Sequence, residues 1–134
     1  MTTFTIPGKP FAKQRARAAV IGGRARMFTA KETVSFERQV GQIAALHFAR
    51  PLEGAVQLTV RAVFQPAESW SRKKREAFLG SWHTQKPDLD NCLKALKDGL
   101  NRIAWADDAQ VAVVVARKVW GLCAETIVTV EAMP

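Results

Sequence analysis

The chain has 134 residues, 48% hydrophobic and 24% charged, which excludes a disordered protein and suits one domain spanning residues 1–134. A net charge of +8 and a pI near 10.1 indicate a polyanionic partner, either nucleic acid or an anionic membrane surface. No stretch approaches the roughly 18 apolar residues of a membrane span, and residues 1–7 lack the layout of a signal peptide. We therefore expect a cytoplasmic protein without membrane attachment.

The first third of the chain predicts a strand, a hairpin and a helix. Residues 2–6 alternate weakly before a turn rich in proline and glycine, which predicts a short strand. Residues 14–29 place alternating basic side chains around Gly22-Gly23, which favours a hairpin, with a flexible basic loop as the alternative. Residues 31–48 carry apolar side chains at helical spacing and predict an amphipathic helix.

The rest of the chain continues to interleave strands and helices. Alternation of Val, Leu and Phe predicts a strand over 55–65, and a serine before a basic run predicts a short helix over 71–79. Apolar residues recur every three or four positions over 89–103, which predicts another helix. Two β-branched runs joined by a glycine, 110–120 and 125–132, predict a closing antiparallel hairpin. We expect one compact α/β (α+β) domain with a mixed β-sheet packed with helices.

Basic residues are concentrated away from the aspartates. Residues 1–31 contain seven basic side chains and no acid, whereas all five aspartates lie between positions 88 and 108. We expect a group of basic residues to bind DNA phosphates with little sequence selectivity. The group consists of Lys9, Lys13, Arg15, Arg17, Arg24, Arg26, Arg72, Lys73, Lys74, Arg75 and Lys86. For any one of these residues, a solvated surface charge is the alternative. Phe11, Phe28 and the four tryptophans either stack on bases or, as we expect for each, pack in the core.

The first aspartates lie at the start of the helix predicted over 89–103. Pro87 disfavours helical geometry for the residue before it, so we expect an extended entry in which Asp88 and Asp90 project to the same side. Asp90, Lys94 and Asp98 step by four along one polar stripe of the helix. Asp98 lies two turns into the helix, away from the pair, and is expected to be structural.

A second pair, Asp107-Asp108, follows this helix and precedes the next strand, where the chain can return beside the first pair. Two such charges 4 Å apart repel by about 4 kcal/mol at an effective dielectric near 20, and a divalent cation would offset this cost. Oxygen-only ligands favour Mg²⁺, with Mn²⁺ as a substitute, and such a site performs phosphodiester hydrolysis. Lys94 would then neutralise charge in the transition state or orient the attacking water.

The same residues admit a structural interpretation. Asp88 or Asp90 would cap a helix, a contribution of about 0.3–1 kcal/mol. Lys94 would be the i,i+4 partner of Asp90, and Asp107-Asp108 would form a solvated turn. Spacing alone does not decide between this interpretation and the metal site.

A longer pattern carries a resemblance to a known family. The string Lys86-Pro87-Asp88-Leu89-Asp90-Asn91 is followed by Lys94, Asp98, Leu100, Asn101, Trp105, Asp107, Asp108 and Gln110. This pattern of about 25 residues resembles the signature of RusA-type crossover junction endodeoxyribonucleases, which occur in bacteria and their prophages. The opening strand, the basic N-terminal region and the length agree more loosely. The spacing of the acidic pairs varies in the family, and Cys92 occupies a variable position.

The resemblance implies a homodimeric Holliday junction resolvase that makes paired symmetric nicks in branched DNA with Mg²⁺, in recombination and repair. It implies catalytic roles for Asp88, Asp90, Lys94 and Asp108, and metal binding by Asp88, Asp90 and Asp108, with Asp107 as the weaker candidate. A C₂ dimer suits this task because it places two equivalent sites on symmetry-related strands.

Two alternatives to a resolvase also have DNA as the partner. One is a metal-dependent nuclease for other branched or single-stranded DNA that uses the same site. The other is a non-enzymatic DNA-binding protein with structural aspartates, whose binding would be indifferent to Mg²⁺. A membrane-surface role is the weakest, because the basic stripe does not flank the apolar helix faces.

Overall fold

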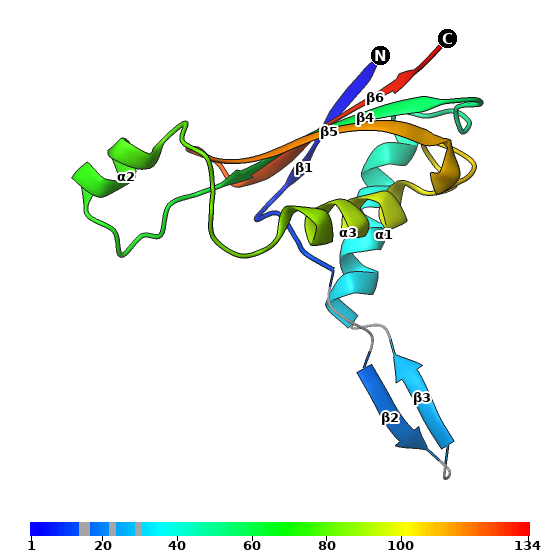
Figure 1. The fold of residues 1–134 in the computed structure, drawn as a ribbon, viewed down its shortest axis with the longest axis horizontal. Coiled ribbons are helices and arrows are strands. Elements are labelled where there is room, and N and C mark those ends of the chain that lie inside the picture. Colours follow the sequence, from blue (N-terminus) through cyan, green and yellow to red (C-terminus); the bar gives the residue numbers. More distant parts are fainter. Residues whose placement is uncertain (14–16, 22–23, 29–30) are drawn as a thin grey trace.

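The computed structural model describes residues 1–13, 17–21, 24–28 and 31–134, and it has an α+β fold in which helices pack on a mixed β-sheet (Figure 1). Side chains are described outside residues 14–30. The elements are β1 (Thr2–Pro7), β2 (Arg17–Ile21), β3 (Arg24–Phe28), α1 (Lys31–Ala45), β4 (Val56–Phe64), α2 (Arg72–Phe78), α3 (Leu89–Leu100), the 3₁₀ turn η1 (Asp108–Gln110), β5 (Val111–Trp120) and β6 (Glu125–Ala132).

The main sheet has the strand order β1-β6-β4-β5, and β5 is its parallel edge strand. β6 runs antiparallel to both β1 and β4, so it lies on the other side of β4 from β5. The predicted antiparallel hairpin of residues 110–120 and 125–132 is therefore wrong, although both strands exist. β2 and β3 pair antiparallel, which confirms the hairpin predicted within residues 14–29.

The link from β5 to β6 passes the end of β4. The amide of Gly121 donates a hydrogen bond to the carbonyl of Phe64, the last residue of β4, at 2.9 Å. A Cβ on Gly121 would lie 2.5 Å from Cγ1 of Val63, a distance that packed atoms do not reach. Glycine at this position lets the chain cross beside β4 rather than turn back along β5.

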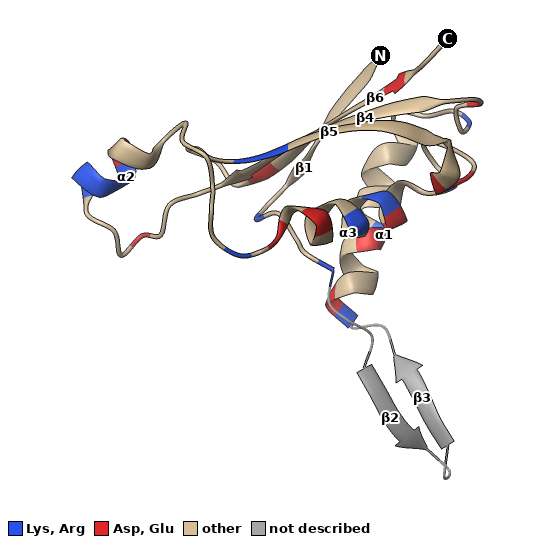
Figure 2. Cartoon of the chain, in the orientation of Figure 1, with Lys and Arg blue, Asp and Glu red and all other residues tan. Residues whose placement is uncertain are grey.

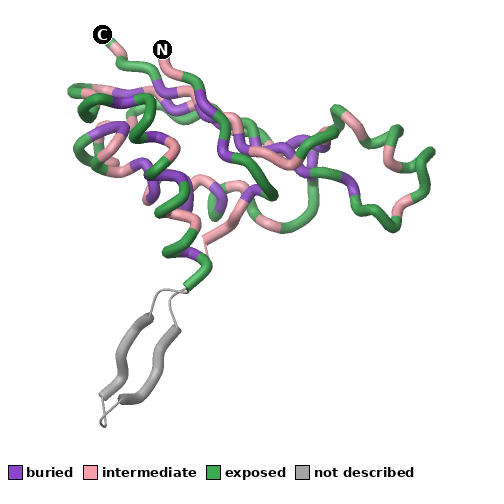
Figure 3. The backbone as a smooth tube through the Cα atoms, turned by 180° about the vertical axis from the view of Figure 1, so that it is seen from behind, coloured by how far each residue is buried: buried purple, intermediate pink, exposed green. Residues whose placement is uncertain are grey.

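α1 and α3 cover one face of the sheet, and the hydrophobic core lies between these helices and the sheet (Figures 1 and 3). Alternate residues of β4 are buried from Val56 to Ala62, as expected for a strand with one covered face. The two helices approach closely, since a Cβ on Gly99 would lie 2.8 Å from that of Val40. A smaller cluster of Ala62, Phe64 and Trp120 forms at the end of the sheet nearest α2.

Most predicted elements are confirmed within a few residues. α3 ends at Leu100 rather than at 103, because Asn101 caps it and Arg102 adopts a left-handed φ of 72°. Cys92 is buried in this helix, whereas Cys123 is exposed. Within the described ranges, no helix is long and apolar enough to cross a membrane.

Candidate active site

A pocket between α3 and β5 gathers the polar stripe of α3 and one residue of the second acidic pair. It has a volume of about 420 Å³ and is called here the aspartate pocket. Its lining residues are Asp90, Leu93, Lys94, Lys97 and Asp98 from α3, Asp108 from η1 and Val114 from β5. Carboxylates 18 positions apart in the sequence thus share one surface, as the predicted return of the chain requires.

Asp88 and Asp90 do not lie together on an extended strand. Asp88 is the N-cap of α3, with φ −67° and ψ 141°, and its side chain makes no capping hydrogen bond. Asp90 is already within the first turn, where its Oδ1 accepts a hydrogen bond of 3.1 Å from the amide of Asn91. The predicted extended entry is confirmed as far as Asp88, but the prediction that both aspartates project from one extended stretch is wrong, because Asp90 already lies in the helix. Both aspartates are exposed, and only Asp90 lines the aspartate pocket.

The two aspartates of the second pair have different surroundings. The indole N–H of Trp105, a fully buried side chain, donates a 2.8 Å hydrogen bond to Oδ1 of Asp108. Asp107 instead caps η1, where its carboxylate accepts a hydrogen bond of 3.0 Å from the amide of Ala109. Trp105 therefore holds Asp108 at the pocket, while the carboxylate of Asp107 is occupied by its own turn.

Gln110 anchors this turn to the rest of the fold. Its Oε1 accepts hydrogen bonds from the amides of Ala106 and Asp107, each at 2.9 Å. Its Nε2 donates to the carbonyls of Leu52 at 2.8 Å and Gly54 at 3.0 Å, just before β4. One amide side chain thus joins the acidic turn to a segment more than fifty residues away in the sequence.

Lys118 holds the segment that leads into α3. Its ammonium donates hydrogen bonds of 2.6 Å to the carbonyls of Gln85 and Pro87, immediately before Asp88. Lys118 pairs in register with the buried Ala62 on β4, so it lies on the core face of β5. Sequence reasoning missed this residue. The available signal was a lysine at an inward position of an apolar strand.

Lys13 does not contribute a free positive charge. Its ammonium forms an ion pair with the carboxylate of Asp98, and each side chain is about one-third exposed, at 33% and 31%. The hydrogen bond that Lys13 donates to Asp98 raises the pKa of Lys13, and burial together with the charge of Asp98 raises the pKa of Glu37. Asp98 is thus structural as predicted, yet it also lines the aspartate pocket.

The remaining predicted DNA-binding residues fall into three groups. Arg72, Lys73, Lys74 and Arg75 belong to α2, a basic helix (Figure 2). The hydroxyl of Ser71 caps this helix by accepting a hydrogen bond from the amide of Lys74. Lys9 and Lys86 line a second pocket beside the sheet. Arg15 lies outside the described residues, and Arg17, Arg24 and Arg26 lie in β2 and β3, where side chains are not described.

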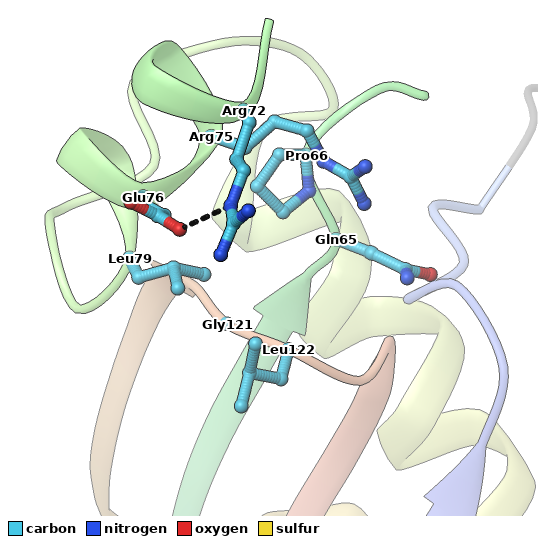
Figure 4. Close-up of a pocket in the computed structure, with 8 residues that line it drawn as sticks. All are labelled: Gln65, Pro66, Arg72, Arg75, Glu76, Leu79, Gly121 and Leu122. Carbon is cyan, nitrogen blue, oxygen red and sulfur yellow. Dashed lines mark hydrogen bonds and ion pairs between the residues drawn. The ribbon is translucent and has the colours of Figure 1, made fainter. Parts of the chain in front are cut away.

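α2 also borders a small cavity of about 180 Å³, drawn in Figure 4. Arg72 and Arg75 line this cavity with the exposed side chain of Leu122. Nε of Arg72 donates a hydrogen bond of 3.0 Å to Glu76, so part of its charge is already paired. An exposed ion pair of this kind contributes little to stability. Glu76 pairs with Arg72 rather than with Arg75, the other arginine that lines the cavity.

The donor set of the aspartate pocket is suited to Mg²⁺. Mg²⁺ prefers oxygen ligands and usually binds through one or two carboxylates while it keeps several waters. Asp90 and Asp108 supply two such carboxylates, and Asp88 precedes Asp90 by two residues. In the part of the chain that is described, no three acidic, histidine or cysteine side chains stand close enough to form a complete ligand cage. Two carboxylates with water fit the preference of Mg²⁺ without such a cage.

Comparison with known proteins identifies the relatives of this chain. The family model described as endodeoxyribonuclease RusA matches residues 7–131. Uncharacterized protein YqaN of Bacillus subtilis (strain 168) is 36% identical over 116 residues, which cover 81% of this chain and 80% of that protein.

Proposed function

Because the chain belongs to the endodeoxyribonuclease RusA family, we propose that it is a Mg²⁺-dependent endonuclease that resolves four-way DNA junctions. The observation that carries the proposal is the shared pocket of Asp90, Lys94 and Asp108. Two carboxylates and a lysine are suited to metal-assisted hydrolysis of a phosphodiester. The net charge of +8 on the chain favours binding of a polyanionic substrate.

In the proposed site, Asp90 and Asp108 would hold Mg²⁺ or its substitute Mn²⁺, and Asp88, which precedes Asp90 by two residues but does not line the pocket, would supply a further carboxylate. When bound, the metal would polarise the scissile phosphate and lower the pKa of a water molecule. The hydrogen bond from Trp105 leaves Asp108 with a fixed orientation and further acceptor capacity. Asp107 is the weaker candidate, because its carboxylate already caps η1.

Lys94 is the proposed partner of the developing negative charge. It lies one helical turn from Asp90 on α3, is exposed, and lines the same pocket as both carboxylates. An ammonium group at that place would stabilise charge on phosphate oxygens or orient the attacking water. The Lys94→Met variant is therefore expected to bind DNA but to cleave it slowly.

Paired nicks require two active sites, so the proposal includes a homodimer. A C₂ dimer presents two equivalent pockets to two symmetry-related strands of a junction. Val113 and Val115 on edge strand β5 share the face opposite Val114 and the aspartate pocket, are 36% and 43% exposed, and form apolar surface of a kind commonly buried at interfaces. Light scattering should give a mass twice the 14.8 kDa of one chain. A monomer in the presence of junction DNA would contradict this part of the proposal.

The decisive experiment is cleavage of a synthetic four-way junction with and without Mg²⁺, beside linear duplex and single strand of the same sequences. Paired, Mg²⁺-dependent nicks confined to the junction are expected. Cleavage of every substrate would instead indicate a general nuclease for branched or single-stranded DNA. Tight binding that is indifferent to Mg²⁺, with no cleavage, would indicate a non-enzymatic DNA-binding protein.

A single substitution separates the metal site from binding. The Asp90→Asn variant is expected to cleave at least about 10³-fold more slowly, which corresponds to about 4 kcal/mol of barrier. Its junction affinity should persist, because the basic residues that contact phosphates are unchanged. The matched control is Glu131→Gln, which removes an exposed carboxylate from β6, outside the aspartate pocket. Near-normal cleavage by Asp90→Asn would refute its role.

A further inference from the structure

A second pocket lies at the end of the sheet nearest α2 and has a volume of about 400 Å³. It is called here the aromatic pocket and is defined by Phe64, Trp70, His83 and Trp120 in its wall and by Lys9 and Lys86. The proposed cleavage reaction does not use any of these residues. Its volume lies within the range of about 300–1,000 Å³ typical of pockets that bind small organic groups.

The wall of this pocket consists of aromatic rings that pack on one another. The ring of His83 stacks on Phe64 with centroids 3.9 Å apart and lies 4.4 Å from the ring of Trp120. Trp70 is tilted by 51° against Trp120 at 5.1 Å, and the ammonium of Lys74 lies 4.1 Å from the centroid of Trp70. Trp70 is half-buried, so its indole is the ring that a ligand can reach most readily.

The charges around the aromatic pocket favour a ligand that carries negative charge beside an uncharged ring. None of the described residues that line it is acidic, and both Lys9 and Lys86 are exposed. Burial lowers the pKa of His83, and the nearby charges of Lys118 and Lys9 lower it further. These effects favour the neutral form of the imidazole, so the positive charge beside the pocket comes from the lysines. Gln65 and Gln85 add amide donors and acceptors to the lining.

The aromatic pocket adjoins the segment that carries the first aspartates. Gln85 and Lys86 line it, and the chain continues through Pro87 to Asp88. The ammonium of Lys118 fixes both ends of this short segment. Lys9 and Pro87 also line a common hollow, so the N-terminal segment touches the same loop. The aromatic pocket is thus linked to Asp90 of the aspartate pocket through residues 86–90 of the chain.

We propose that the aromatic pocket binds one unpaired nucleobase of the DNA substrate, stacked on Trp70, with the neighbouring phosphates held by Lys9 and Lys86. This inference rests on the proposed function only in taking DNA as the ligand. Aromatic rings bind unstacked bases of any sequence, because every base has a π-face, and lysines beside them bind the backbone. Gln65 and Gln85 would hydrogen-bond the edge of the base and supply a preference among the four.

The test is a binding measurement without divalent metal, so that it is independent of cleavage. Single-stranded oligonucleotides and four-way junctions carry the fluorescent base 2-aminopurine at successive positions. Stacking on an indole should quench the fluorescence at one or two positions near the crossover and along the single strand. The Asp90→Asn variant should give the same quenching, so failure of the cleavage proposal would leave this test readable.

Two tryptophan variants give the matched comparison. Trp70→Ala should abolish the quenching and weaken single-strand binding about tenfold, the loss expected for one stacked base. Trp82→Ala removes a tryptophan that is 65% exposed and does not line the aromatic pocket, and it should retain the quenching. An abasic nucleotide at the quenched position should weaken binding by the native chain but not by Trp70→Ala. Equal quenching in the native chain and Trp70→Ala would overturn the proposal.

A third variant covers the case in which Trp70→Ala does not fold. Lys9→Met changes an exposed side chain and should leave the circular dichroism spectrum unchanged. It should weaken binding and lower the slope of log affinity against log salt by about one, as expected for one lost phosphate contact. An unchanged salt slope in Lys9→Met would show that DNA does not enter this pocket. The same conclusion would follow if the abasic nucleotide did not weaken binding by the native chain.

Discussion

The hydrogen bonds of Lys118 allow a specific test of how β5 positions the first aspartates. In the variant Lys118→Met, a side chain of similar length lacks the ammonium that binds the carbonyls of Gln85 and Pro87, each at 2.6 Å. Hydrogen bonds to charged groups contribute about 1.5–3 kcal/mol each, and solvent reduces this because Lys118 is half-buried. We expect a loss of about 2 kcal/mol in the free energy of unfolding.

This loss should appear both in stability and in metal dependence. At about 4 °C per kcal/mol for a chain of this size, the melting temperature should fall by about 8 °C. Asp88 directly follows the released segment, so the Mg²⁺ concentration for half-maximal junction cleavage should rise by about tenfold, the equivalent of about 1.4 kcal/mol. The two quantities are measured by calorimetry and by cleavage rates across a Mg²⁺ titration.

The control for Lys118→Met is Arg117→Met, which removes a neighbouring cation from the exposed face of β5. It should leave both the melting temperature and the Mg²⁺ dependence unchanged. A fall in stability without a change in Mg²⁺ dependence would mean that the segment before Asp88 does not position a metal ligand. If neither quantity changed in Lys118→Met, the reasoning from these hydrogen bonds would be refuted.

Three further predictions concern the fold around the two pockets. Burial lowers the pKa of His83, so its contribution to the free energy of unfolding should be fully present above about pH 6.5 and be lost as the pH falls through the folded-state pKa. Urea unfolding should show this decline in the native chain and not in His83→Phe. Asp98→Asn removes the ion pair with Lys13 and should cost about 1 kcal/mol at pH 7 in urea unfolding. That difference should vanish as the pH rises through the raised pKa of Lys13, and a cost that persists there would argue against the ion pair. Gly99→Ala should destabilise the chain by about 1–3 kcal/mol, since the added Cβ would lie 2.8 Å from that of Val40; a higher melting temperature would show that the helices separate easily.

Local patterns were sufficient to predict most helices and strands. Alternation in β4 and the apolar spacing of α1 and α3 follow from one covered sheet face, and each is written within a short stretch of chain. The basic helix α2 follows its predicted cap, Ser71. Trp82 is an exception, since it is 65% exposed although core packing was expected. A single large side chain does not indicate which neighbours are available to cover it.

Strand order could not be derived from the same patterns. β5 and β6 are β-branched runs joined by a short link, which equally fits a hairpin or a crossing beside β4. The choice depends on β4, some fifty residues earlier, whose free edge accepts β5 in parallel. The close approach of Gly121 to Val63 accompanies that choice and is visible only in three dimensions.

For the candidate site, the sequence by itself determined the chemistry that is available: clustered aspartates, a lysine one turn from Asp90, and an excess of positive charge. The tertiary structure decided which of these groups meet. Trp105 orients Asp108 rather than Asp107, Asp98 pairs with Lys13, and Lys118 reaches the loop before Asp88 from a distant strand. The physical reason is that residue types and local periodicity are encoded within a few positions, whereas a hydrogen bond between distant segments exists only after packing brings its donor and acceptor within about 3 Å.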